Sequence, residues 1–350
     1  MPGKNMISKL KDKQIGGIQM VKTVGTAEAV QGEKTRGFLQ VGTDTDGTPF
    51  KLPVLVATGN EEGPTLWVQA CVHGDEYGGA ASIIRFFQEL DLSQLRGTLI
   101  GVPVTNLPSF KARYRTSPLD GANLNRIFPG DANGTYSQRL AHALLTAQTE
   151  TADYVVDFHS GGNGAYVPFY VICDYDESEA GKKSMWLAER MGSDVIWRSE
   201  AETDINGTGT AHLVSKGIPA VAVECGGGNV TEDHERLFKE SIENAMKALD
   251  MLPGEAPVQQ EYTIINGADF FFVGEGGLFV PACHVGEVLN KGDLIGSVMN
   301  LYGDVTEELF CPSDNAYIAA VGHRYWPVHP GQLIAEAIPI VGHKTSGKDS

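Results

Sequence analysis

Short apolar runs alternate with amphipathic stretches from about residue 65 to residue 250 of this 350-residue chain. This alternation is typical of strands that alternate with helices, and it predicts an α/β fold in which helices flank a central sheet. Thr231 stands where its hydroxyl can cap the last expected helix. The expected strands are residues 65–72, 98–104, 154–158, 166–172 and 219–223. The expected helices, with apolar residues three and four positions apart, are residues 77–90, 137–150, 178–191 and 232–251.

A change of pattern after residue 250 predicts a second domain. Residues 251–260 contain two prolines and a glycine after a long expected helix, so we place a linker there. Beyond it, short apolar runs are separated by glycines without a helical period, which indicates a small all-β domain. The chain therefore divides into residues 1–255, whose first sixty residues add strands to the main sheet, and residues 256–350.

The charge of the chain excludes some partners. Forty-four acidic residues against 27 lysines and arginines give a formal charge of −17, which repels nucleic acid phosphates and anionic membrane surfaces. The five cysteines are odd in number and form no Cys-x-x-Cys pair, so we expect reduced, mostly buried thiols. No apolar run suits a secretory signal or a membrane span, and we expect a soluble cytoplasmic protein.

Two side chains that can bind a metal follow the first central strand. Residues 65–72 lead directly into His73-Gly-Asp-Glu76 before a helix begins. The carboxyl ends of strands in α/β sheets form the crevice where ligands bind, so an imidazole and a carboxylate would share that crevice. The alternative is an ordinary strand-to-helix loop in which Asp75 or Glu76 interacts with the helix N-terminus.

A second strand presents another histidine in the same way. The strand at residues 154–158 ends at His159, 83 positions beyond Glu76. Two histidines and one carboxylate leave the fourth tetrahedral position of a zinc ion open for water, as in catalytic rather than structural zinc sites. Asp157, two positions earlier, would orient a ligand or face the substrate. A lone histidine is more often structural, so the pair carries the prediction.

A third strand ends in a carboxylate. Residues 219–223 lead into Glu224, which Cys225 and three glycines follow. Hydrolysis at a metal needs a base that takes a proton from water and later protonates the leaving amine, and Glu224 is the candidate for this role. The alternative is a glutamate that only hydrogen-bonds to the glycine-rich backbone.

The loop between these strands is rich in arginine although the chain is acidic. Residues 113–130 contain Arg113, Arg115 and Arg126. The planar guanidinium group suits a carboxylate, and a cation near a metal can stabilise the oxyanion that forms when water attacks a carbonyl. Surface salt bridges with the abundant acidic residues are the alternative interpretation.

Four motifs in order give the chain its resemblance to a known family. They are His73-Gly-Asp-Glu76, Asn125-Arg126 within Asn-Leu-Asn-Arg-Ile-Phe-Pro-Gly, His159 within Asp-Phe-His-Ser-Gly, and Glu224 within Val-Glu-Cys-Gly-Gly. With these motifs the chain resembles the succinylglutamate desuccinylase/aspartoacylase family of zinc carboxypeptidase-like hydrolases. The resemblance covers most of the chain and implies a mixed central sheet flanked by helices.

The resemblance also implies roles for the residues. His73, Glu76 and His159 would bind one Zn²⁺ per chain, with Glu224 as general base and proton shuttle. Further residues that match family motifs are Arg115, which would polarise the carbonyl, and Asn125 and Arg126, which would bind the substrate carboxylate. Arg113 lies two positions from Arg115 and is the alternative to it.

The second domain resembles the C-terminal β module of the same family, which is similar to biotinyl and lipoyl carrier domains. A carrier needs an exposed lysine at a hairpin tip, and residues 299–308, the expected tip, contain none. We therefore expect a packing, lid or oligomer-contact element, which leaves a homo-oligomer open and favours small substrates over peptides. Two short segments, Arg-Thr-Ser-Pro-Leu-Asp and Glu-Cys-Gly-Gly-Gly, are most similar to the diaminobutyrate deacetylases of ectoine breakdown.

The function that these features predict is zinc-dependent hydrolysis of the amide bond of a small N-acyl amino acid. A carboxypeptidase that acts on short peptides, and a protein that binds metal without hydrolysis, are the alternatives. A redox or nucleotide-binding enzyme is disfavoured, because the chain lacks Gly-x-Gly-x-x-Gly after a strand and a Walker-type loop. The same ligands also accept cobalt or manganese. Residues 198–207 are expected to contribute to substrate preference.

Overall fold

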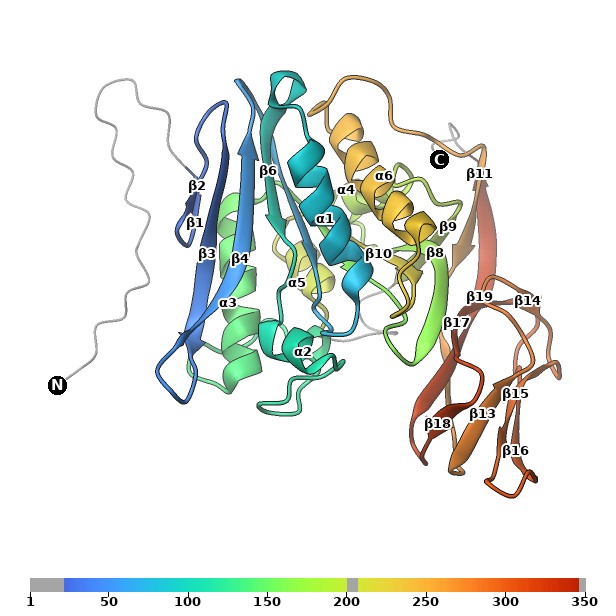
Figure 1. Ribbon diagram of the computed structural model, residues 1–350. Helices are drawn as coiled ribbons and strands as arrows, with labels where there is room; N and C mark the ends of the chain where they lie inside the picture. The colour runs from blue at the N-terminus through green and yellow to red at the C-terminus, as the bar shows by residue number, and fades with distance from the viewer. Residues whose placement is uncertain (1–21, 200–206, 346–350) are drawn as a thin grey trace, which may run out of the picture.

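The computed structural model describes residues 22–199 and 207–345, so most of the loop at residues 198–207 lies outside the described residues. A broad sheet with helices on both faces leads into a C-terminal β region (Figure 1). The helices are α1 (Tyr77–Glu89), α2 (Leu107–Ala112), α3 (Tyr136–Thr151), α4 (Glu179–Ala188), α5 (Gly209–Ser215) and α6 (Glu232–Ala248). The 3₁₀ helices are η1 (Leu92–Gln94) and η2 (Leu124–Arg126).

The strands fall into two groups along the chain. Those that precede α6 are β1 (Thr23–Val24), β2 (Ala27–Glu28), β3 (Lys34–Thr43), β4 (Pro49–Thr58), β5 (Glu61–Ala70), β6 (Arg96–Val102), β7 (Tyr154–His159), β8 (Ala165–Asp174), β9 (Val195–Ser199) and β10 (Ala220–Gly226). Those that follow it are β11 (Glu261–Ile265), β12 (Asp269–Phe272), β13 (Gly277–Pro281), β14 (Val288–Leu289), β15 (Leu294–Met299), β16 (Val305–Phe310), β17 (Ala316–Gly322), β18 (Trp326–Val328) and β19 (Leu333–Thr345).

The main sheet is mixed, as the sequence predicts. Its order is β14-β17-β19-β11-β9-β8-β10-β7-β5-β6-β4-β3, and β12 pairs with β19. Strands β6, β5, β7 and β10 run parallel to one another, whereas β8 runs antiparallel to β10 and β4 antiparallel to β6. The carboxyl ends of β5, β7 and β10 therefore meet at one edge of the sheet.

Apolar side chains bury both faces of this sheet. Helices α1 and α6 pack against each other on one face, where Phe87 and Phe238 lie in a cluster with Phe158 of β7. On the other face, Leu144 of α3 and Leu213 of α5 lie in a cluster with the strands. The helical spacing of apolar residues explains why each helix buries one side.

Most of the expected elements are confirmed, with ends shifted by a few residues. The Thr231 hydroxyl accepts the backbone N–H of His234, which confirms the predicted cap of α6. Strands β3 and β4 extend the main sheet as expected. Helices α2 and α5 were missed, because six and seven residues are too few to show a helical period. All five cysteines are buried and unpaired, as predicted.

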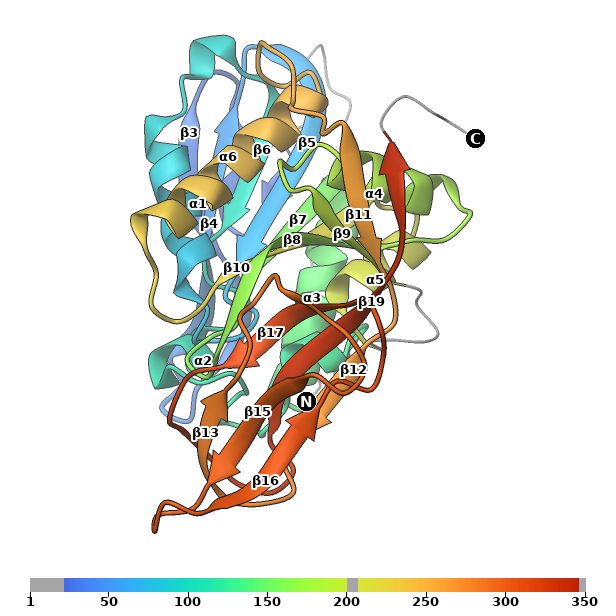
Figure 2. The same cartoon turned by 90° about the vertical axis from the view of Figure 1, so that its right-hand side faces the viewer.

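The C-terminal region is joined to the main sheet by strand pairing. Strand β11 runs parallel beside β9, and β17 pairs with the start of β8. Strand β19 pairs with β11, β12 and β17, and a separate sheet holds β16, β15, β13 and β18. Figure 2 shows β17 and β19 between the helix-covered part of the sheet and β13, β15 and β16. The predicted boundary at residue 255 falls between α6 and β11 and stays a prediction.

No helix within residues 22–199 and 207–345 combines the length and apolar character that crossing a membrane requires.

Candidate active site

A tight turn at the end of β5 presents His73 and Glu76. Cys71 has a left-handed backbone (φ 54°), and the buried Asn106 holds the turn by donating to the Val72 carbonyl over 3.3 Å. A Cβ on Gly74 would lie 1.9 Å from the Ser109 carbonyl carbon, so only glycine fits there. Helix α1 then begins immediately after Glu76.

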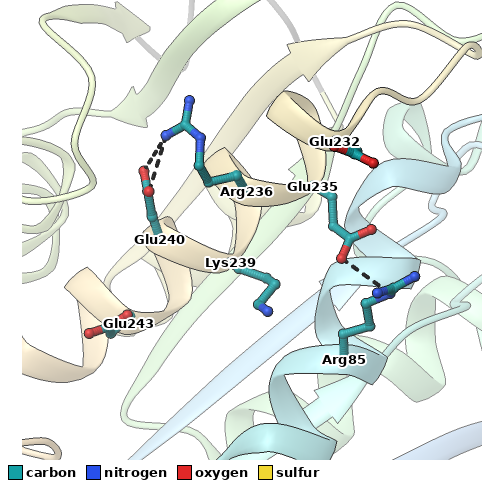
Figure 3. Close-up of a pocket in the computed structure, with 7 residues that line it drawn as sticks. All are labelled: Arg85, Glu232, Glu235, Arg236, Lys239, Glu240 and Glu243. Atoms are coloured by element: carbon teal, nitrogen blue, oxygen red, sulfur yellow. Dashed lines mark hydrogen bonds and ion pairs between the residues drawn. The ribbon is translucent and has the colours of Figure 1, made fainter.

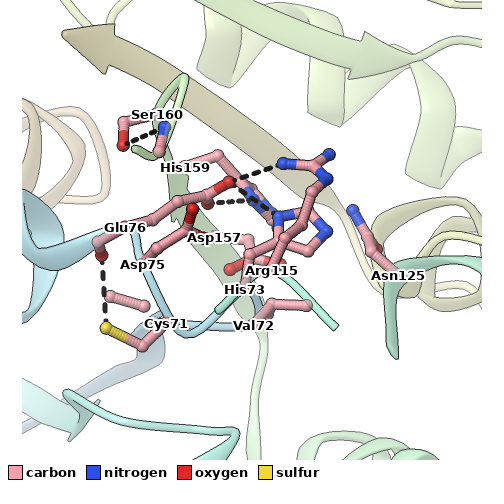
Figure 4. Close-up of polar contacts among 12 residues, drawn as sticks. Cys71, Val72, His73, Asp75, Glu76, Arg115, Asn125, Asp157, His159 and Ser160 are labelled. Atoms are coloured by element: carbon pink, nitrogen blue, oxygen red, sulfur yellow. Dashed lines mark hydrogen bonds and ion pairs between the residues drawn. The ribbon is translucent and has the colours of Figure 1, made fainter. Parts of the chain in front are cut away.

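His73, Glu76 and His159 converge in a buried cluster, as the sequence predicts for three metal ligands. Each offers a ligand atom within 4.8 Å of the others. Nδ1 of His73 lies 2.8 Å from Glu76 Oε1, and Nδ1 of His159 lies 2.9 Å from Glu76 Oε2. Figure 4 shows both rings next to the Glu76 carboxylate, with dashed lines that mark these contacts. Both histidines thus direct the same nitrogen toward one point.

The other nitrogen of each ring faces an oxygen. Nε2 of His73 lies 3.0 Å from Asn123 Oδ1, and Nε2 of His159 lies 3.2 Å from Asp157 Oδ2. Such outer oxygens are typical of histidines that bind metals, because they fix the ring and its tautomer. Asp157 therefore lies beside His159. This position is compatible with the first of its two predicted roles, that of orienting a metal ligand.

The tautomer of His73 shows that the site fits a cation. Asn123 Oδ1 already accepts the backbone N–H of Asn125 over 3.0 Å, so this oxygen must be the atom that faces His73. His73 Nε2 is therefore the donor, and a neutral ring has only a lone pair on Nδ1. Burial lowers the pKa of His73 to about 4, so the ring is neutral at pH 7. The Nδ1 lone pair of His73 and the Glu76 carboxylate oxygen repel each other, and a cation between them would stabilise both.

The pKa of His159 predicts that metal binding releases a proton. Burial acts to lower this pKa, but Asp157 and Glu76 outweigh it and raise the pKa well above its usual value. The metal-free site therefore holds a proton on His159 at pH 7, and a histidine ligand must lose it. We expect about one proton to be released per zinc ion and the apparent affinity to rise with pH. Calorimetry in two buffers of different ionisation enthalpy measures this, and equal heats in both would contradict it.

Glu224 lies beside the cluster of His73, Glu76 and His159, because its strand β10 pairs with β7. Its Cα pairs with His159 on β7 and with Tyr170 on β8. Oε2 of Glu224 is buried and has no hydrogen-bond partner within the described residues. Burial, with Glu76 and Glu336 nearby, raises the pKa of Glu224 to about 8, against the opposing charge of His159. A carboxyl group with a pKa near neutrality can both accept and donate a proton.

The predicted arginines and Asn125 occupy different positions around the cluster. Arg115 Nη1 donates to Glu76 Oε1 over 3.0 Å, so Arg115 contacts the cluster (Figure 4), whereas Arg113 ends α2 in a left-handed conformation. Asn125 Oδ1 accepts the backbone N–H of Gly209, at the start of α5. Arg126 Nη1 donates to the Asn125 carbonyl over 2.7 Å, and Arg126 lies in the field of Arg115, Glu336 and Glu224.

Two residues near the site were missed from the sequence. Asn123 orients His73, and its position two residues before Asn125 in Asn-Leu-Asn was the available signal. Glu336 comes from β19, and no motif marks it, because the pairing of distant strands brings it to the site.

A hollow on the surface between α1 and α6 has a different character (Figure 3). Arg85 on α1 pairs with Glu235 at 3.1 Å, and Arg236 pairs with Glu240 at 2.9 Å. Its cations are thus held by neighbouring carboxylates, and it contains none of the predicted site residues.

Comparisons with known proteins identify the family of the chain. The chain matches the succinylglutamate desuccinylase/aspartoacylase catalytic domain over residues 62–250. The N-alpha-acetyl-L-2,4-diaminobutyric acid deacetylase of Halomonas elongata is 29% identical over 274 residues, which are 76% of this chain and 80% of that protein.

Two solved structures share the fold. The succinylglutamate desuccinylase/aspartoacylase of Rhodobacter sphaeroides has a TM-score of 0.78 and 25% identity and covers 88% of this chain and 96% of its own. The product-bound ectoine utilization protein EutE (DoeB) of Ruegeria pomeroyi has a TM-score of 0.78 and 25% identity, with 87% and 95% covered. Together with the match to the catalytic domain, these likenesses confirm the resemblance: this protein belongs to the succinylglutamate desuccinylase/aspartoacylase family.

Proposed function

We propose that this protein hydrolyses the amide bond of a small N-acyl amino acid with the help of one zinc ion held by His73, Glu76 and His159. The observation that carries the proposal is the buried cluster, in which the Nδ1 lone pair of His73 faces the Glu76 carboxylate. Because Glu224 lies beside the cluster in register with His159, a proton acceptor stands next to the metal ligands.

The chain's own groups would keep the ligands in place. Asn123 and Asp157 hold the outer nitrogens of the two histidines, and Arg115 donates to Glu76. A zinc ion bound here supplies positive charge that polarises an amide carbonyl and makes a nearby water more acidic. Arg115, whose side chain is partly exposed, adds a second positive charge beside Glu76 that would stabilise a developing oxyanion.

Glu224 would move the protons of the reaction. It would take a proton from the attacking water and deliver it to the amine nitrogen as the carbon–nitrogen bond breaks. Its raised pKa, about 8, favours the second step, because a carboxyl group that holds its proton near neutral pH can donate it. The buried Oε2 atom, unpartnered within the described residues, is free for this exchange.

Asn125 and Arg126 would bind the α-carboxylate of the substrate. Arg126 supplies a planar pair of donors. The Asn125 amide nitrogen donates to no group within residues 22–199 and 207–345, while the amide oxygen accepts from Gly209. Fixing the carboxylate would align the amide with the water. The Halomonas elongata relative is named for an N-acetyl amino acid, which favours a deacylase over a carboxypeptidase.

We also propose a cellular compartment, a domain division and an assembly for this protein. Five buried, unpaired thiols are consistent with a reducing compartment, and we place the protein in the cytoplasm. Residues 1–255 would form the catalytic domain and residues 256–350 the β domain, with a homo-oligomer as the proposed assembly.

Amine release from a substrate panel tests the proposal. The zinc-loaded protein should release amino acid from N-acetyl amino acids, and a chelator should abolish this release. N-acetyl amines with the same side chain but no carboxylate should be about 10- to 100-fold poorer in kcat/KM, because they lose charge-assisted hydrogen bonds to Arg126 and Asn125.

Free dipeptides and N-succinyl amino acids complete the panel. Release only from free dipeptides would identify a carboxypeptidase instead, and release from N-succinyl amino acids would identify a larger acyl pocket. Full zinc occupancy without turnover of any amide would leave a metal-binding protein and contradict the proposed hydrolysis.

A further inference from the structure

Glu336 reaches the active site from the C-terminal region. It lies on β19, where its Cα pairs with Ala320 of β17 and with Phe270 of β12. Strand β17 in turn pairs with the start of β8 at Tyr166, which lies seven positions after His159 at the end of β7. Glu336 is half-buried, whereas most glutamates are exposed.

The alternation of side chains along β19 turns Glu336 toward the catalytic part of the molecule. Ala335 and Ala337, its neighbours on the strand, lie in the core of the C-terminal region. Successive side chains of a strand point to opposite faces, so Glu336 shares the other face with Ile338. Ile338 lies in a cluster with Tyr170 of β8. Glu336 therefore faces the side on which Tyr170 lies.

Tyr170 connects this face to the predicted catalytic residues. Its Cα pairs with that of Glu224, so the two side chains are neighbours on one face of the sheet. Burial raises the pKa of the Tyr170 hydroxyl well above its usual value, and Glu224 and Glu336 add to this shift. The carboxylates of Glu224 and Glu336 are thus both close enough to the Tyr170 hydroxyl to raise its pKa.

The charges around Glu336 are not balanced by direct contact. Within residues 22–199 and 207–345, its carboxylate forms no hydrogen bond or ion pair, although it lies in the field of Arg115 and Arg126. Burial raises the pKa of Glu336, and the two arginines oppose this shift. A carboxylate in this position is available to a positively charged group of a bound molecule.

We propose that Glu336 binds the positively charged side chain of the substrate's amino acid, which makes it a specificity-determining residue. The inference rests on the proposed function, because it assigns the α-carboxylate to Asn125 and Arg126 and the acyl group to the zinc side. The side chain of the substrate's amino acid is the one group not yet assigned, and we assign it to Glu336. An ammonium group there would gain a charge-assisted hydrogen bond.

The same carboxylate would select against a second negative charge. A substrate with an acidic side chain would place two carboxylates next to each other, and like charges in a half-buried site repel. The substrate class is therefore an N-acyl amino acid with a basic side chain, rather than one with an acidic side chain.

Variants of Glu336 test this assignment through substrate preference. We expect the wild-type protein to favour Nα-acetyl-ornithine over Nα-acetyl-norvaline, which has an uncharged side chain, and over Nα-acetyl-glutamate. In Glu336→Gln the ratio of kcat/KM between the basic and the neutral substrate should fall about 10- to 100-fold. Glu336→Lys should shift the preference toward Nα-acetyl-glutamate. A loss that is equal for all three substrates would show a structural role and overturn the proposal.

Equilibrium binding separates this inference from the proposed function. Calorimetry with ornithine and norvaline, on zinc-loaded wild-type and Glu336→Gln protein, measures side-chain preference without turnover. Tighter binding of ornithine that depends on Glu336 would support the inference even if no amide were hydrolysed, and equal binding of both amino acids would overturn it. Glu308→Gln, an exposed change on β16 that removes the same charge, should leave the ratio unchanged.

Discussion

Replacing Glu224 with glutamine should lower kcat by about 100- to 10,000-fold while the protein keeps its zinc. The amide of glutamine has nearly the shape of the carboxyl group, but it cannot take a proton from water or return one to the leaving amine. Because the Glu224 carboxylate forms no hydrogen bond or ion pair with His73, Glu76 or His159 among the described residues, its side chain is not needed to hold the proposed ligands. Turnover of an N-acetyl amino acid and zinc content should be measured on the same sample.

Two further results sharpen this test. The residual activity of Glu224→Gln should lose the pH dependence that the raised pKa of Glu224 gives the wild type, in which kcat/KM falls as the carboxyl group is protonated at lower pH. Near-normal turnover in a zinc-loaded Glu224→Gln protein would contradict the assignment. Loss of zinc together with turnover would instead show that Glu224 supports the metal site.

Replacing Glu76 with glutamine should have the largest effect on metal binding. Glu76 contacts His73, His159 and Arg115, and its pKa is lowered because the two histidines outweigh the effect of burial. The variant loses a proposed ligand and the negative charge that would offset that of zinc. We expect zinc affinity to fall by more than the roughly 10- to 100-fold that outer-shell residues contribute, and turnover to be lost with it.

Asp75 provides a matched control for this variant. It is buried next to Glu76, but its carboxylate accepts the backbone N–H of Asn163 over 3.0 Å and is not part of the cluster. Asp75→Asn removes the same charge at the neighbouring position, and it should retain zinc. Competition with a chromogenic chelator compares the two affinities. Similar zinc affinities for both variants would contradict the ligand role of Glu76.

The part of the site that the sequence predicted comes from strand ends. His73, His159 and Glu224 each follow an apolar run, and three such runs in parallel strands must end at the same edge of the sheet. The alternation of apolar runs and helices in the sequence was enough to predict these strands and where they end. The sequence therefore identified three residues, the proposed metal ligands His73, Glu76 and His159, that the structure brings together.

The rest of the site depends on contacts between distant parts of the chain. Glu336 lies 112 positions beyond Glu224, and it reaches the site because β17 pairs with β8 and β19 with β17. Such pairings leave no local periodicity to interpret. Asn123 was missed for another reason: its role depends on which atom of an amide faces a histidine, which only the local hydrogen bonds decide.

The position of β19 has a consequence for the synthesis of the protein. The chain has passed every proposed metal ligand by residue 159 and the proposed base at residue 224, but β19 runs from Leu333 to Thr345. Until that strand leaves the ribosome, one side of β11 and one side of β17 have no partner. The nascent chain therefore carries open strand edges, which favour aggregation, until residues 333–345 have been synthesised. The proposed substrate site, which includes Glu336, is complete only once β19 has paired with β17.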